Sequence, residues 1–143
     1  MKAKKNNSKE KEQVKIQAKA VVDKGVIEEY FYMIPKDVTV SELEQAVHCV
    51  SEENKEIWTE LDLMEVVLET DSLIFENMMD TFDEEADKAF LENKGIKVVY
   101  AASYNTKDKA VVKKVLEELY QAFGGFIASD TEDLEPMFEI ADF

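Results

Sequence analysis

A near-continuous apolar run in the second half of the chain has the pattern of a central β-strand. The run is Ile96-Lys97-Val98-Val99-Tyr100-Ala101-Ala102-Ser103, which suits a strand covered on both faces. A broad apolar helical face follows at Val111, Val112, Val115, Leu116, Leu119, Tyr120 and Phe123. Gly124-Gly125 ends that helix, and residues 126–129 predict a last short strand. Strand, helix and strand together predict a right-handed βαβ unit.

The N-terminal part of the chain predicts a β-hairpin. Apolar residues alternate along residues 14–22, as in a half-buried strand. Asp23-Lys24-Gly25 is a turn signal because Gly25 tolerates a positive φ, and residues 26–34 alternate again as the returning strand. Tyr30 and Tyr32 lie on one side of that strand. The number of helices expected favours burial of both rings in the core over a role as exposed anchors for a partner.

Two capping boxes predict two further helices. Thr39-Val40-Ser41-Glu42 precedes apolar residues at helical spacing and predicts a helix over about residues 40–53. Thr81-Phe82-Asp83-Glu84 predicts a second helix over about residues 82–93, with Gly95 as its left-handed cap. Between them, residues 57–69 fit either a helical stripe or a strand. We favour a helical or irregular start with a strand at about 63–69, followed by a short strand over about 72–76.

These elements predict an α+β fold. We expect a single mixed sheet, made of the N-terminal β-hairpin and the C-terminal βαβ unit, packed against about three helices. Residues 1–13 are predicted to be a mobile basic leader, and residues 14–143 to be one domain. The apolar residues Met137, Phe138, Ile140 and Phe143 near the end are expected to pack back onto the domain, because an exposed cluster of that size is costly.

Charge excludes several classes of partner. The chain has 17 basic residues, all of them lysines, against 32 acidic ones, for a net charge of −15. Residues 1–24 carry a net +5 and the remaining residues a net −20. A body of that charge repels nucleic acid and anionic membranes, and without arginine it lacks the planar fork that grips phosphate at two points. We therefore expect a basic protein partner, with no direct binding of nucleic acid or membrane by the folded body.

The same sequence predicts a cytoplasmic protein. No apolar run approaches the ~20 residues that span a bilayer, and no apolar segment follows the N-terminal lysines as in a secretory signal. Cys49 is the single cysteine, which suits a reducing compartment.

Few residues point to catalysis or to a cofactor. His48 and Cys49 are adjacent, and neighbouring side chains on a helix diverge by about 100°, so no activated thiolate is expected. One histidine and one cysteine do not make a structural zinc site, and residues 130–135 lack the ligand and glycine positions of a calcium loop. We predict no catalytic residues, no metal and no cofactor. A non-enzymatic protein is favoured, with enzymatic activity left open.

Two clusters of carboxylates are the candidate partner-binding residues. They lie before and within the second predicted helix and near the C-terminus: Asp80, Asp83, Glu84, Glu85, Asp87, Asp130, Glu132, Asp133 and Glu135. Favourable interaction with the helix dipole explains some of the first group without any partner. Ser103, Tyr104 and Asn105, between a strand and a helix, are the alternative candidates for a small-molecule site.

We expect a small acidic interaction or regulatory protein that binds a basic protein partner, as immunity proteins, antitoxins and nucleic-acid mimics do. Charge complementarity of this kind predicts binding that weakens as salt rises. One alternative is a small-molecule-binding domain or small enzyme with a pocket at the carboxyl ends of its strands. Another is a housekeeping or phage-type domain whose acidity serves only its solubility. Scattered carboxylates would favour that last reading, and one continuous patch would favour the first.

Overall fold

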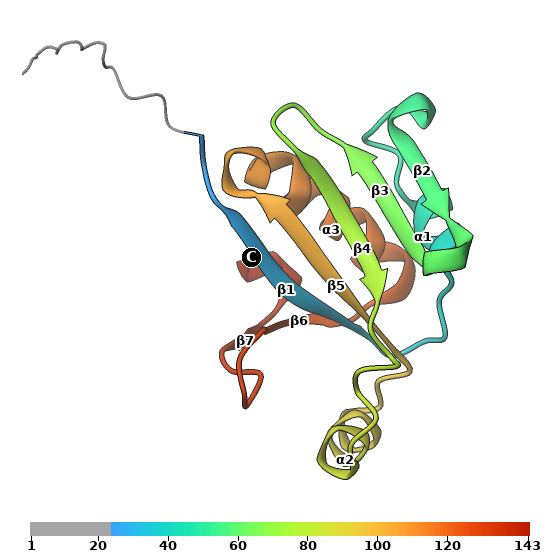
Figure 1. Ribbon diagram of the computed structural model, residues 1–143, viewed down its shortest axis with the longest axis vertical. Helices are drawn as coiled ribbons and strands as arrows, with labels where there is room; N and C mark the ends of the chain where they lie inside the picture. The colour runs from blue at the N-terminus through green and yellow to red at the C-terminus, as the bar shows by residue number, and fades with distance from the viewer. Residues whose placement is uncertain (1–23) are drawn as a thin grey trace, which may run out of the picture.

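Seven strands form one sheet in the computed structural model, which describes residues 24–143 (Figure 1). The strand order is β2-β3-β4-β5-β1-β6-β7, and every neighbouring pair is antiparallel. The strands are β1 Ile27–Ile34, β2 Lys55–Trp58, β3 Leu63–Val67, β4 Ser72–Asn77, β5 Val98–Asn105, β6 Phe126–Ser129 and β7 Met137–Phe138. With three α-helices this is the α+β fold that the sequence predicts.

The centre of the sheet is the pair β1 and β5. The apolar run becomes β5, which pairs with β1 along its whole length. On its other side β1 pairs with β6 over Tyr30–Met33. Since β5 and β6 are each antiparallel to β1, they run parallel to one another with β1 between them. The predicted βαβ unit is therefore split by the first described strand. The other strand of the predicted hairpin, residues 14–22, and the predicted leader, residues 1–13, lie outside the described residues.

Local hydrogen bonds set the ends of the helices α1 (Val40–Ala46), α2 (Glu85–Lys94) and α3 (Lys109–Phe123). The capping box at the start of α1 forms as predicted between Thr39 and Glu42. The helix is shorter than predicted because Glu118 of α3 accepts the His48 and Cys49 amides at 2.9 and 3.0 Å, which turns the chain away after Ala46.

The second capping box does not form. The Thr81 hydroxyl donates to the Met78 carbonyl at 2.8 Å, so it is used in the preceding turn, and α2 begins later, after Glu84. Gly95 ends α2 in the predicted left-handed conformation, with φ 71°. The ambiguous segment begins with the last two residues of β2, a strand that was not predicted, and continues through a 3₁₀ turn over Thr59–Leu61. The predicted helical or irregular start is therefore correct only for the turn, whereas β3 confirms the strand that follows.

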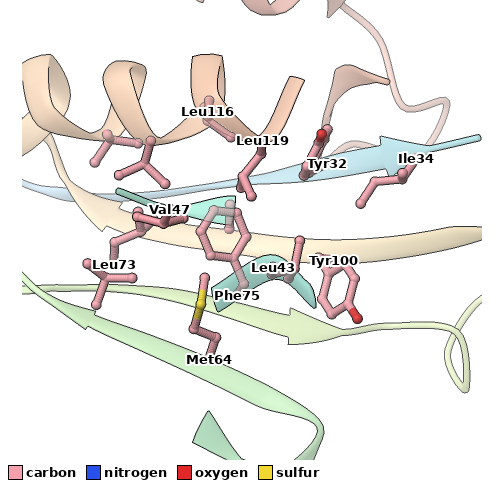
Figure 2. Close-up of a cluster of buried hydrophobic side chains, with 14 of the residues drawn as sticks. Tyr32, Ile34, Leu43, Val47, Met64, Leu73, Phe75, Tyr100, Leu116 and Leu119 are labelled. Carbon is pink, nitrogen blue, oxygen red and sulfur yellow. The ribbon is translucent and has the colours of Figure 1, made fainter. Parts of the chain in front are cut away.

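One face of the sheet carries the main core. Helices α1 and α3 lie on this face, behind the strands in Figure 1, and Figure 2 shows their side chains meeting those of β1, β3, β4 and β5. Tyr32 is fully buried and donates to the Gly124 carbonyl at 2.6 Å, and Tyr30 packs edge-on against Phe138 and Phe143. Both tyrosines thus belong to the core, and the C-terminal apolar residues pack back onto it as predicted.

Among residues 24–143, the other face is covered only at one end. A smaller apolar cluster there joins Phe82 and Leu91, from the start and the body of the α2 region, to Phe31 and Met33 of β1 and Val99 of β5. In Figure 1 α2 lies beyond that end of the sheet, and no described helix lies in front of the remainder of β3, β4 and β5.

Candidate functional site

The uncovered part of this second face is the candidate binding surface, which we call the open face. Strand alternation turns the following residues outward on it: Ile27, Glu29, Glu56, Trp58, Leu63, Glu65, Val67, Ser72, Ile74, Glu76 and Ser103. Large apolar side chains on it are exposed to water, with Ile27 at 61 %, Trp58 at 42 % and Val67 at 47 %. No lysine occupies an outward position in a described strand of this face.

Register places acidic residues in a row across the open face. Glu56 is opposite Glu65, Glu65 is opposite Ile74, Ile74 is opposite Ser103, and Ser103 is opposite Glu29. Side chains directly opposite each other on antiparallel strands lie about 4.5–5.5 Å apart at Cβ, and like charges so placed destabilise the sheet. Repulsion between Glu56 and Glu65 therefore lowers the stability of the fold. A contribution to stability does not explain why two glutamates lie opposite each other here.

Glu29 is a carboxyl of the open face whose pKa is raised. Partial burial raises the pKa of Glu29, and the nearby carboxylates of Asp130 and Glu76 raise it further. Charges from β1, from β4 and from the segment after β6 thus converge on one region. This region attracts cations and repels anions.

Hydrogen bonds orient the carboxylates at the opposite side of the open face. Ser72 Oγ donates to Glu65 Oε2 at 2.5 Å, and Asn105 Nδ2 donates to Asp71 Oδ2 at 2.9 Å. Asp108, which is 5 % exposed, accepts the amides of Thr70 and Asp71 at 3.2 and 3.1 Å. The turn between β3 and β4 is therefore fixed to the start of α3, which holds the rim of the face in place.

The acidic residues predicted from the sequence lie outside the strand positions that form the open face. Asp80, Asp83, Glu84 and Glu85 are exposed in the turn before α2 and at its start, and Asp87 is half-buried in its first turn. In the turn after β6, Asp133 Oδ1 accepts from Thr131 Oγ1 and the Glu135 amide at 3.2 and 3.1 Å, so it shapes that turn. Glu132 and Glu135 are exposed there. Asp130, one of the predicted residues, affects the open face because its carboxylate raises the pKa of Glu29.

The alternative small-molecule residues do not converge. Ser103 faces the open side of β5, whereas Tyr104 is buried on the opposite side and donates to Glu28 Oε1 at 2.8 Å. Asn105 is 4 % exposed and its amide is fully engaged with Lys24, Asp71 and Lys107. Of the three, Ser103 alone presents a polar group to the surface.

The His48–Cys49 pair has no features of a nucleophile. Both residues follow α1 and are exposed. Although Cys49 is exposed, the protein atoms around its sulfur partly desolvate the thiol and raise its pKa to about 11, and the Glu118 carboxylate raises it as well, so the thiol stays protonated at neutral pH. Within residues 24–143, no group of three histidine, cysteine or acidic side chains is arranged to hold a metal ion.

Sequence reasoning missed Glu29, Glu56, Glu65 and Glu76. Their signal was present, because each glutamate is next to an apolar or aromatic residue that faces the core, as in Met64-Glu65-Val66 and Phe75-Glu76. That alternation shows that one side of a strand is polar. It does not show that the polar sides of four strands share one uncovered face, which depends on strand order and register.

No described helix is long and apolar enough to cross a membrane. Comparison of the chain with protein-family models, with curated proteins and with solved structures found no match.

Proposed function

We propose that this protein is a cytoplasmic interaction protein that binds a basic protein partner through its open face. The observation that carries the proposal is the row of carboxylates beside exposed apolar side chains, on a sheet face whose described strands carry no outward lysine. Interfaces of specific complexes combine apolar anchors such as tryptophan with charges that complement the partner. Trp58 and the glutamate row supply both.

The cost of the arrangement supports the same proposal. Carboxylates opposite one another in a sheet repel, and partial burial disfavours the charge on Glu29. A cationic partner removes both penalties when it binds, so part of the free energy that folding loses returns as binding free energy. A second copy of this chain would bring a second acidic row against the first, and like-charge repulsion opposes that dimer. A toxin-neutralising protein, an antitoxin or a nucleic-acid mimic has the acidic surface that this proposal requires.

The test is capture of partners by the full-length chain at low salt, followed by binding measurements with the purified partner. The triple variant Glu29→Gln/Glu56→Gln/Glu76→Gln removes open-face charge, and we expect it to weaken binding about a hundredfold, at roughly 1 kcal/mol for each of the three charge contacts. The matched control is Glu84→Gln/Glu85→Gln/Glu132→Gln, which removes equal charge from the predicted clusters outside the open face. We expect it to change the affinity much less.

Two results would overturn the proposal. A captured partner that is not basic, or that stays bound equally at low and high salt, contradicts charge complementarity. Equal weakening by the two triple variants would mean that net charge alone, and not the open face, governs the interaction.

A further inference from the structure

A shallow hollow of about 320 Å³ lies within the open face. Strands β1, β3, β4 and β5 and the turn before β4 contribute to it. Its lining consists of Ile27, Glu65, Asp71, Ser72, Ile74, Ser103 and Tyr104. Glu29, Glu76 and Asp130 are not part of this lining, although Glu29 lies opposite Ser103 on the neighbouring strand.

The lining divides into apolar and anionic parts. Ile27 and Ile74 supply aliphatic surface, and Ile27 is 61 % exposed. Glu65 and Asp71 supply the negative charge. Each carboxylate accepts a hydrogen bond through one oxygen, Glu65 Oε2 from Ser72 and Asp71 Oδ2 from Asn105. Within residues 24–143, no group donates a hydrogen bond to Glu65 Oε1 or Asp71 Oδ1.

This chemistry suits a group with an aliphatic stem and a cationic end. A lysine side chain covers apolar surface with its methylene groups and keeps its ammonium at a polar rim. The ammonium has three donors, which suits single oxygens on separate carboxylates and a hydroxyl such as that of Ser103. A guanidinium prefers both oxygens of one carboxylate, and here one oxygen of each is already used.

We propose that this hollow seats one lysine side chain of the basic partner, with its stem against Ile27 and Ile74 and its ammonium between Glu65 and Asp71. This inference rests on the proposed function for the source of the lysine. The recognition itself depends only on the hollow, so it is testable without the partner.

The probe is n-butylammonium, titrated into the full-length ¹⁵N-labelled chain and followed by amide chemical shifts. We expect saturable shifts at Ser72, Ile74 and Ser103 with a dissociation constant in the millimolar range, about that of a small fragment. Ammonium ion, which lacks the stem, and n-butanol, which lacks the charge, are expected to give much smaller shifts at these amides.

Matched variants make the test specific. Glu65→Gln removes a charge from the rim of the hollow, and Glu56→Gln removes one from the residue opposite it on β2, outside the lining. We expect Glu65→Gln to weaken butylammonium binding about fivefold, the effect of one charge contact near the surface, and Glu56→Gln to weaken it less. Equal effects of the two variants, or shifts spread over the acidic surface, would overturn the inference.

The two proposals fail in different ways. If the partner is sensitive to the open-face triple variant, which keeps Glu65, but indifferent to Glu65→Gln, the lysine seat is wrong and the proposed function stands. If butylammonium binds in the hollow but the open-face triple variant leaves the affinity for the partner unchanged, the proposed function is wrong. The inference that the hollow binds an alkylammonium group is then still supported.

Discussion

Glu29 is a residue whose charge lowers the stability of the fold and adds to the negative charge of the open face. Its carboxyl has a raised pKa because of partial burial, with further contributions from Asp130 and Glu76. A group whose pKa is higher in the folded state than in the unfolded state binds protons more tightly when folded. Stability therefore falls as pH rises from the unfolded-state pKa through the folded-state pKa, and the full penalty is present at neutral pH.

We expect Glu29→Gln to stabilise the protein at pH 7 by a few tenths of a kcal/mol, a value discounted for the exposure of this side chain. The gain should disappear at a pH well below the unfolded-state pKa, where the carboxyl of the parent protein is protonated in both states. Urea unfolding at the two pH values measures the difference. Glu53→Gln, in an exposed 3₁₀ turn away from the open face, is the control. A destabilised Glu29→Gln protein at pH 7 would contradict this account.

Among the elements, β2 depends on a single buried lysine. Lys55 has a side chain only 2 % exposed, and its Nζ donates to the Glu44 and Val47 carbonyls at 3.0 and 2.6 Å. It also pairs with the Glu44 and Glu52 carboxylates, each at 3.2 Å. The last carbonyls of a helix lack their usual amide partners one turn on, although that of Glu44 also accepts the Val47 amide at 3.3 Å. The lysine places a cation at the end of α1 and holds the edge strand to that helix.

Lys55→Met is expected to destabilise the protein by roughly 2–3 kcal/mol, somewhat less than the loss of one partner from a fully buried ion pair. The variant leaves two carbonyls and the Glu44 carboxylate without their cation. Glu52→Gln, whose parent side chain is 85 % exposed, should have a much smaller effect. Urea denaturation of both variants gives the comparison. Similar losses would show that the exposed pair, and not the buried contacts to α1, holds the strand.

The elements also show what a sequence reveals about a fold and what it leaves open. The run at residues 96–103 predicted a central strand because burial on both faces leaves a continuous apolar pattern, and β5 is central. The insertion of β1 between β5 and β6 was not predictable, because it depends on pairing between segments distant in the chain. Thr81 matched a capping pattern, yet its hydroxyl bonds to Met78, an equally local alternative that the pattern does not distinguish.

The candidate site depends on this distant pairing more than the fold class does. Alternation identified strands, but Glu65 and Glu29 share a face only because β4 and β5 lie between β3 and β1 in register. The clusters that stood out in the sequence, such as Asp83-Glu84-Glu85, are contiguous in the chain, and they lie in the turn before α2 and the turn after β6 instead of on the face. The density of charge along the sequence therefore predicted that the surface is negative, but it did not predict which residues form the open face.

For the molecule as a whole, the excess of carboxylates gives stability and binding opposite responses to salt. The chain carries 32 acidic residues against 17 lysines, so self-repulsion opposes the folded state. We expect the free energy of unfolding at pH 7 to rise by about 1 kcal/mol between low salt and half-molar NaCl, the size of one close like-charge contact in water. Affinity for the basic partner should fall over the same range, since salt screens attraction as well as repulsion.

Urea unfolding and binding titrations at matched salt concentrations test this opposition. The triple variant Glu29→Gln/Glu56→Gln/Glu76→Gln should gain less stability from salt than the parent protein, because part of the repulsion that salt screens is already removed. Its partner binding should also be less sensitive to salt, because fewer charge contacts remain. Salt effects of the same sign on stability and binding would show that something other than the carboxylates of the open face dominates both.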